Sequence, residues 1–266
     1  MPKRNGSTSR SIPLNSEVAS VRKALDLLTA FSVAQPKHSL SALARKCKIP
    51  KSTAHNLMQT LLGFDLVRQD PQTREYRIGP RAMELGLLFA RRDELLSQAR
   101  RVLRLLADET GETVKLGVLF AGDVLILAAV ESAHQLHTRG DAGTRWPLHS
   151  TGLGKALLSA LSGTEVEELL SRRELTAATK STITRLPDLR QELIRIRTRG
   201  YAVDLEENEP GVCCVAAPIL DPLGGVAASI SVSGPRIRLD DKRLKQIGGR
   251  VAALVKKLAI LRTEES

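Results

Sequence analysis

Residues 39–62 contain two short helical patterns joined by the tight turn Lys48-Ile-Pro50, and no other segment constrains the fold as strongly. From Lys51 onward, apolar residues recur at i, i+3, i+4, i+7 and i+8, which predicts one buried stripe: Ala54, Leu57, Met58, Leu61 and Leu62. The opposite face carries side chains long enough to reach phosphates and base edges: Lys51, Ser52, His55, Asn56 and Gln59. This division predicts a helix that packs with one side and reads DNA with the other.

The positive charge of the chain is concentrated in the same region. Residues 1–80 hold 13 Lys and Arg against 5 Asp and Glu, whereas the remaining residues hold 27 against 24. A basic segment attracts polyanions, so the first third is the expected site of contact with double-stranded DNA.

The length and composition predict a folded protein of two domains. The chain has 266 residues, 42% of them hydrophobic but only 3% aromatic, so its cores must consist of Leu, Ile, Val and Ala. Three cysteines, two of them adjacent, do not suggest a disulfide framework. No apolar run is long enough to cross a membrane, and residues 1–16 form a basic tail without the apolar segment of a signal peptide. We therefore expect a cytoplasmic protein with a flexible tail at 1–16.

Residues 17–80 are predicted to form a winged helix-turn-helix. A first helix over about 17–31, with Ser16 as its cap, would bury Val18, Val21, Leu25 and Leu28. Ser39 or Ser41 can cap the next helix. After Gly63, strands at 66–69 and 74–78 surround the turn Asp70-Pro-Gln-Thr73 and make a hairpin.

The hairpin carries three arginines that are candidates for contact with the phosphate backbone or the minor groove: Arg68, Arg74 and Arg77. The alternative is that they are ordinary solvated charges. Thr53 and the two cap serines, Ser39 and Ser41, complete the set of candidate DNA contacts.

A linker helix at 81–95 and an α+β domain at 96–262 are expected next, with a C-terminal tail at 263–266. Apolar residues on more than one face of the linker helix favour self-association. The second domain is predicted to contain an antiparallel sheet and helices. Its strands are expected at 113–119, 124–130, 201–205, 212–219 and 226–232. One helix is expected at 154–161. A second begins at a capping box of Thr164 and Glu167, a third ends at Gly200, and a last one begins near Asp240.

Three blocks of this sequence resemble the IclR family of bacterial transcriptional regulators. They are the Lys51-Ser-Thr helix with its wing, the segment Leu148-His-Ser-Thr-Gly-Leu-Gly-Lys-Ala156, and residues 200–207 with 211–218 and 229–234. The resemblance spans about residues 18–260. It implies a winged helix-turn-helix, a linker helix and a GAF-like effector domain, assembled as homodimers or homotetramers.

The resemblance also implies a pocket for a small carboxylate or aromatic-acid effector. Mapped by motif, this pocket would use Gly152, Leu153, Asp204, Cys214, Ser231 and Ser233. The chain departs from the family at Asn56, where the recognition helix often carries Arg, so an operator sequence does not transfer.

The residues of this pocket have physical interpretations of their own. Gly152-Leu153 would present backbone N–H groups at a helix N-terminus, unless the segment is an ordinary tight turn. Ser231 and Ser233 share one face of a strand and either line a cavity or face solvent. Asp204 beside an anion would have to be protonated or bind a hydroxyl. Cys214 is either a pocket-lining thiol or a buried, inert one.

Other motifs are incomplete. Gly152-Leu-Gly-Lys155 lacks the upstream glycine and the following Ser or Thr of a phosphate loop. The spacing of His134, His137 and His149 is too loose for a metal site, and solvated histidines are the better interpretation. Cys214 with His149 lacks an orienting third group for catalysis. We therefore expect no enzyme activity, no metal and no cofactor.

Together these features predict a ligand-responsive transcriptional regulator that binds operator DNA. The alternative is a constitutive DNA-binding protein whose C-terminal domain only oligomerises.

Overall fold

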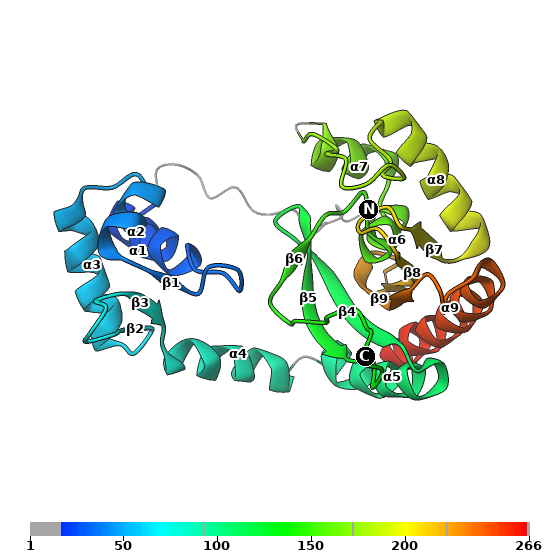
Figure 1. Cartoon of the computed structure of the whole chain (residues 1–266), viewed down its shortest axis with the longest axis horizontal. Coiled ribbons are helices and arrows are strands. Elements are labelled where there is room, and N and C mark those ends of the chain that lie inside the picture. The colour runs from blue at the N-terminus through cyan, green and yellow to red at the C-terminus, as the bar shows by residue number, and fades with distance from the viewer. Residues whose placement is uncertain (1–16, 93, 172, 222, 265–266) are drawn as a thin grey trace. The chain divides into compact units, whose positions relative to one another are not determined.

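The computed structural model describes residues 17–92, 94–171, 173–221 and 223–264, and it divides into two compact units, Met1–Phe89 and Ala90–Ser266 (Figure 1). The tail expected at 1–16 and the cap expected at Ser16 lie outside the described residues.

Unit 1 contains a helix-turn-helix followed by a hairpin, as predicted. Its elements are α1 (Ala19–Thr29), β1 (Lys37–His38), α2 (Leu40–Lys46), α3 (Lys51–Gly63), β2 (Val67–Gln69), β3 (Tyr76–Ile78) and the first part of α4 (Pro80–Arg92). The short strand β1 was not predicted from the sequence. It pairs antiparallel with β3, so the wing is a three-stranded sheet in the order β1-β3-β2.

The buried stripe predicted for α1 is wrong at three of its four positions. Val18, Val21 and Leu25 are more than half exposed, whereas Leu28 packs against the core of unit 1, and the residue that the helix buries there is Leu27. The helix has apolar residues on two faces, and periodicity alone does not identify which one meets the core. The stripe predicted for α3 is confirmed, because Ala54, Met58 and Leu61 are buried and Leu57 and Leu62 pack against them.

Unit 2 is an α+β domain built on an antiparallel sheet of six strands in the order β6-β5-β4-β9-β8-β7, which confirms the predicted fold class. Its elements are α5 (Glu94–Thr110), β4 (Thr113–Phe120), β5 (Asp123–Val130), β6 (Arg145–Trp146), α6 (Gly152–Ser159), α7 (Gly163–Leu170), α8 (Leu186–Arg199), β7 (Ala202–Leu205), β8 (Val212–Leu220), β9 (Val226–Pro235) and α9 (Asp241–Glu264).

Helices cover both faces of this sheet (Figure 1). Alternate residues of each strand point to opposite faces. On β8, Val215 and Ala217 pack with α5 and α9, whereas Ala216 packs with α6 and α8. The polar residues of the central strands all lie on the α6 face, and this places a candidate pocket between α6 and the sheet.

Several predicted boundaries shift. Helix α6 begins at Gly152 rather than Gly154, and β6 was not predicted. The capping box of α7 is formed by Ser162 and Glu165, not by Thr164 and Glu167, because the Ser162 hydroxyl accepts from the Glu165 N–H and the Glu165 carboxylate accepts from the Ser162 N–H. Helix α9 continues to Glu264, into the expected tail.

Candidate functional site

The strand register brings polar residues from distant parts of the chain into one row across unit 2. Thr113 of β4 is paired with Ser233 of β9, Ser233 with Cys214 of β8, and Cys214 with Asp204 of β7. A second row lies beside the first and holds Lys115, Ser231, Ala216 and Ala202. The small alanines of this second row leave space above the sheet.

The N-terminus of α6 lies over this space. Thr151 caps the helix by accepting from the Gly154 N–H at 3.1 Å, and among the described residues the Gly152 and Leu153 N–H groups have no acceptor. Gly152 permits the approach, because a Cβ there would lie 2.8 Å from the Sγ of Cys214. The predicted helix N-terminus is therefore present, and its two unpaired N–H groups belong to residues that line the space above the sheet.

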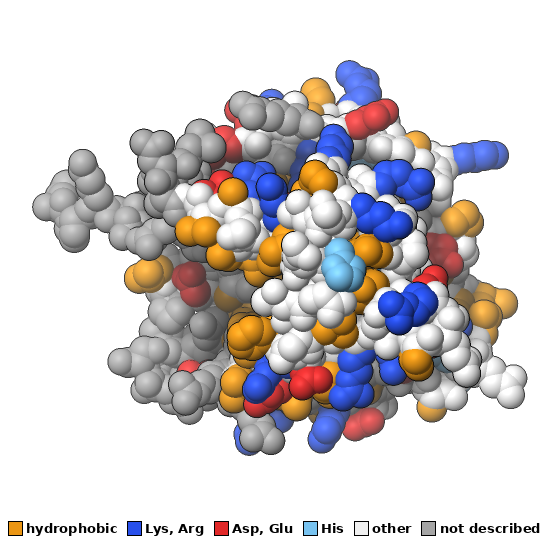
Figure 2. All heavy atoms as spheres, turned by 90° about the vertical axis from the view of Figure 1, so that its left-hand side faces the viewer, with side chains coloured by type: hydrophobic (Ala, Val, Ile, Leu, Met, Phe, Trp, Pro, Cys, Tyr) orange, Lys and Arg blue, Asp and Glu red, His pale blue; other side chains and the backbone are white. Residues whose placement is uncertain are grey.

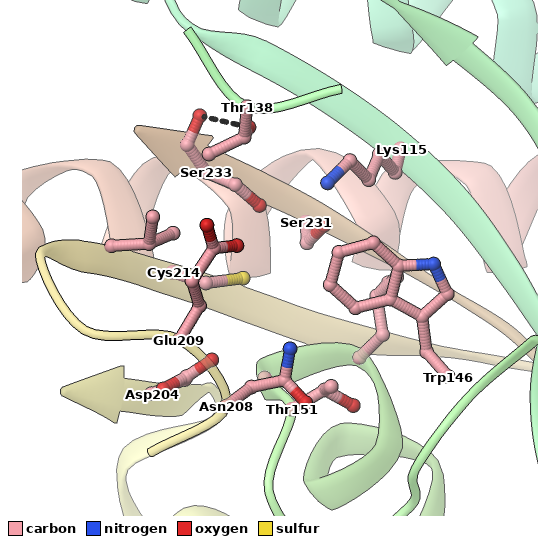
Figure 3. A pocket seen from close by; sticks show the side chains of 13 residues that line it. Lys115, Thr138, Trp146, Thr151, Asp204, Asn208, Glu209, Cys214, Ser231 and Ser233 are labelled. Atoms are coloured by element: carbon pink, nitrogen blue, oxygen red, sulfur yellow. Dashed lines mark hydrogen bonds between the residues drawn. The ribbon is translucent and has the colours of Figure 1, made fainter. Parts of the chain in front are cut away.

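A cavity of about 400 Å³, including its mouth, lies between α6 and the two rows (Figure 3). All six residues predicted for the effector site line it. Seven further lining residues were not predicted, and they come from β4, β6, the start of β8 and three loops: Lys115, Thr138, Trp146, Thr151, Asn208, Glu209 and Val212. The register of β4 against β9 is the signal that would have found Lys115, and the sequence alone does not give that register.

Asp204 lies in this cavity and is 4% exposed. Burial raises its pKa to about 7, although a hydrogen bond from the Glu207 N–H and the charge of Lys155 oppose the shift. Near neutral pH this carboxyl is therefore protonated in part, and in that form it can donate a hydrogen bond to a bound acid.

The two polar groups above β8 and β9 are neutral. Burial raises the pKa of the Cys214 thiol to about 11, so the thiol stays protonated and unreactive at neutral pH. The Oγ of Ser231 is completely buried and lies close to the Cys214 thiol, a weak hydrogen-bond group, with no other partner in the described part of the chain. Because a thiol is a weak partner, this hydroxyl can take a stronger hydrogen bond to a bound polar molecule.

Lys115 supplies a positive charge at the other side of the cavity (Figure 3). Its side chain is almost fully enclosed, and its Nζ lies 4.5 Å from the centre of the Trp146 ring, within the range of a cation–π contact. Burial lowers the pKa of this ammonium, and nearby acidic groups, including Glu209 and Asp204, oppose that shift.

A second candidate site lies on unit 1, where the polar face of α3 is open to solvent. Lys51, Ser52, His55, Asn56 and Gln59 are exposed, and Thr53 is half-buried. On this side of unit 1, Lys and Arg side chains lie above, to the right of and below an area of uncharged surface, in which a His side chain lies beside hydrophobic patches (Figure 2). Ser39 caps α2 through its hydroxyl, and Ser41 is exposed on the same helix.

The wing sheet adds a row of cations to unit 1. Lys37, Arg77 and Arg68 are paired across β1, β3 and β2, and all three side chains are exposed. Like charges directly opposite one another on a sheet repel, so this row suits a polyanion. Arg74 lies apart, in the turn of the hairpin, with a left-handed φ of 59°. Lys37 was not among the predicted DNA contacts, because the strand that carries it, β1, was not predicted.

The histidines differ from expectation at one position. His149 is not solvated: it is buried, and its Nε2 lies 3.0 Å from the Thr176 carbonyl oxygen. Within the described ranges, no group of three or more His, Cys, Asp or Glu residues is arranged to hold a metal ion. None of the helices described there has the length and apolarity needed to span a membrane.

Comparison with known proteins identifies both units. Residues 20–71 match the IclR helix-turn-helix domain, and residues 89–260 match the C-terminal domain of the bacterial transcriptional regulator IclR. The chain belongs to the IclR family. Its similarity to other IclR-type proteins extends over most of its length, and these are regulators of transcription rather than enzymes, as expected from the sequence.

Three similar proteins illustrate this relationship. The HTH-type transcriptional regulator BhcR of Paracoccus denitrificans is 37% identical over 242 residues, 91% of this chain and 86% of BhcR. A crystal structure of a putative IclR regulator from a Silicibacter species superimposes with a TM-score of 0.80 at 29% identity and covers 92% of this chain and 95% of its own.

The third is an IclR homologue from Microbacterium hydrocarbonoxydans, solved as a complex with 4-hydroxybenzoate. It shares the fold, with a TM-score of 0.77 at 22% identity, and covers 90% of this chain and 98% of its own.

Proposed function

We propose that this chain is a cytoplasmic transcriptional regulator. A small organic acid, bound between α6 and the sheet of unit 2, controls its affinity for operator DNA. The observation that carries the proposal is the pair of unpaired N–H groups at Gly152 and Leu153, residues that line a cavity containing the buried hydroxyl of Ser231. A helix N-terminus is a favourable site for a carboxylate.

The other cavity residues support an acid of limited size. The enclosed part of the cavity is about 30 Å³, room for about two water molecules, so only a small acid fits and part of it must lie in the mouth. Asp204, in its protonated form, and Ser233 can hydrogen-bond the part of the ligand away from α6. The structure with 4-hydroxybenzoate supports this class of ligand, because that protein has the same fold.

Unit 1 would hold the DNA. In the proposed complex α3 enters the major groove and presents Ser52, Asn56 and Gln59 to base edges, while Lys51 and the cation row of the wing meet phosphates. Residues 17–80 thus serve DNA binding, 81–95 the linker, and 96–262 effector binding and assembly as a homodimer or homotetramer. The exposed apolar side chains of α4, including Leu85 and Phe89, support assembly.

Footprinting on the DNA upstream of the gene, with and without a panel of carboxylic and aromatic acids, tests the proposal. At least one acid is expected to change the protected region or the protein concentration needed for protection. The same acid should raise the melting temperature, since a ligand that binds only the folded state stabilises it. Protection that no acid changes, together with an unmoved melting temperature, would instead favour a constitutive DNA-binding protein with a purely oligomerising second domain.

A further inference from the structure

Among the described residues the buried ammonium of Lys115 has no ion-pair partner, although the more distant charges of Glu209, Asp204 and Asp141 favour its charged form. The residue is 3% exposed, and within the described residues its Nζ makes no hydrogen bond or ion pair. Its close neighbour is the face of the Trp146 ring, at 4.5 Å. A buried charge is costly unless an opposite charge or hydrogen bonds compensate it, and an aromatic face compensates it only in part.

A molecule bound in the cavity can supply the missing opposite charge or hydrogen bonds. Lys115 lines it, and Figure 3 shows the Lys115 amine above the Trp146 ring on one side of the cavity, with Asp204 and Glu209 on the other. Of these two carboxyl groups, Glu209 is exposed and therefore screened by solvent, and Asp204 is protonated in part near neutral pH. Neither is an ion-pair partner of Lys115.

The cavity therefore has two separate positive poles. The N-terminus of α6 lies against β8, where Gly152 approaches Cys214 and Ala216. Lys115 belongs to β4, which is separated from β8 by β9. Neighbouring strands are about 4.8 Å apart, so the backbone positions that support the two poles are about 10 Å apart.

We propose that the effector is a short dicarboxylate, with one carboxylate on the Gly152 and Leu153 N–H groups and the second on the Lys115 ammonium. Ser231, which is paired with Lys115 across β4 and β9, donates its hydroxyl, whose one neighbouring partner is the weak Cys214 thiol, to the second carboxylate. This assignment rests on the proposed function of the same cavity. The helix N-terminus alone requires only one carboxylate in the ligand. Lys115 adds the requirement for a second negative charge.

Matched acid pairs test this requirement on the full-length protein. Oxalate, malonate, succinate and glutarate are compared by titration calorimetry with their monoamides, which keep the size and one carboxylate but lose the second charge. At least one dicarboxylate is expected to bind ten or more times more tightly than its own monoamide. Equal or tighter binding of every monoamide overturns the inference.

Variants of Lys115 assign the preference to this residue. Lys115→Met keeps the length of the side chain and removes the charge, so the ratio between dicarboxylate and monoamide affinities should fall to about one. Lys115→Arg keeps the charge and should retain a preference. Lys245→Met, which removes an exposed cation from α9 on the opposite face of the sheet, should leave the ratio unchanged. A ratio that survives in Lys115→Met also overturns the inference.

The outcomes separate this inference from the proposed function. Binding of monocarboxylic or aromatic acids without a preference for dicarboxylates removes the role of Lys115 and leaves the effector cavity in place. A protein that binds none of the acids, with one charge or two, contradicts both.

Discussion

The ammonium of Lys155, on α6, donates to the carboxylate of Glu207 in the segment that follows β7, and both groups are buried. The same ammonium donates to the Val203 carbonyl oxygen at 2.7 Å. Next to this pair, the Glu207 N–H donates to Asp204 at 2.8 Å. The ion pair therefore fixes one wall of the cavity, α6, to the opposite wall, which carries Asp204.

Breaking this ion pair should destabilise unit 2 strongly. Lys155→Met leaves the Glu207 carboxylate buried without its partner, and the loss of one member of a buried pair costs about 3–5 kcal/mol. Urea denaturation followed by circular dichroism measures the change. Arg185→Ala removes one member of an exposed pair with Asp188 and should change the free energy of unfolding little. Similar small changes in both variants would show that the buried pair contributes nothing.

Gly152→Ala should weaken acid binding, because the added Cβ would lie 2.8 Å from the Cys214 Sγ and would push the start of α6 away from the sheet. Gly163 is the matched control: it also begins a helix, α7, and a Cβ there meets nothing within 4 Å. The acid-induced rise in melting temperature should be reduced in Gly152→Ala and unchanged in Gly163→Ala.

The same steric clash should lower the stability of Gly152→Ala. Adding Cys214→Ala should restore part of that stability, and no recovery would argue against the contact between the added Cβ and the Cys214 Sγ.

Stability should depend on pH through Asp204. Burial raises the pKa of this carboxyl to about 7 in the folded protein, against 3.8 as its ordinary value, so the folded state binds more protons between those limits. Its contribution to stability is complete below about pH 4 and is lost as the pH rises through 7. Asp204→Asn removes the titrating carboxyl and its pH-dependent contribution to the free energy of unfolding. The free energy of unfolding of the variant, minus that of the original protein, should therefore increase from pH 4 to pH 8. A difference that is constant with pH would contradict the shift.

Arg77→Gln should affect DNA binding and stability in opposite directions. Arg77 is paired with both Lys37 and Arg68, so removing its charge relieves repulsion in the wing sheet and should raise the free energy of unfolding by a few tenths of a kcal/mol. Affinity for all DNA sequences should fall, and the slope of log K against log salt should decrease by about one unit or less. Arg74→Ala should have the same effect on the slope. An unchanged slope would exclude either arginine as a phosphate contact.

Asn56→Ala should relax base discrimination and leave the salt dependence of binding unchanged, because Asn56 is an exposed, uncharged residue of α3. Selection from a randomised DNA library, for the variant and the original protein, measures the preference at each position. An identical preferred sequence would exclude Asn56 as a base contact.

The sequence predicted those elements whose residues share a strong local pattern. The stripe of α3 and the end of α8 at Gly200 are encoded by neighbours along the chain, and the structure contains both. The stripe of α1 failed at Val18, Val21 and Leu25, because Val21 and Leu27 lie on different apolar faces of one helix. Strands of two residues, β1 and β6, carry too few side chains to show a period.

The cavity was predicted only where a local pattern or the family resemblance marked a residue. Ser231 and Ser233 share a face because they are two apart on one strand, and Gly152 begins a helix. Lys115 and Trp146 reach the same cavity through strand pairing between segments distant in sequence, and no local pattern encodes that pairing. Pairing of β1 with β3 likewise placed Lys37 beside Arg77.

The central position of β9 in the sheet determines when the sheet can form during synthesis of the chain. Strand β9 connects β4 to β8, and it is the last strand to leave the ribosome. Until residue 235 has been synthesised, the two halves of the sheet have no common neighbour and the polar rows do not exist. The cavity between α6 and the sheet can therefore form only late in the synthesis of the chain.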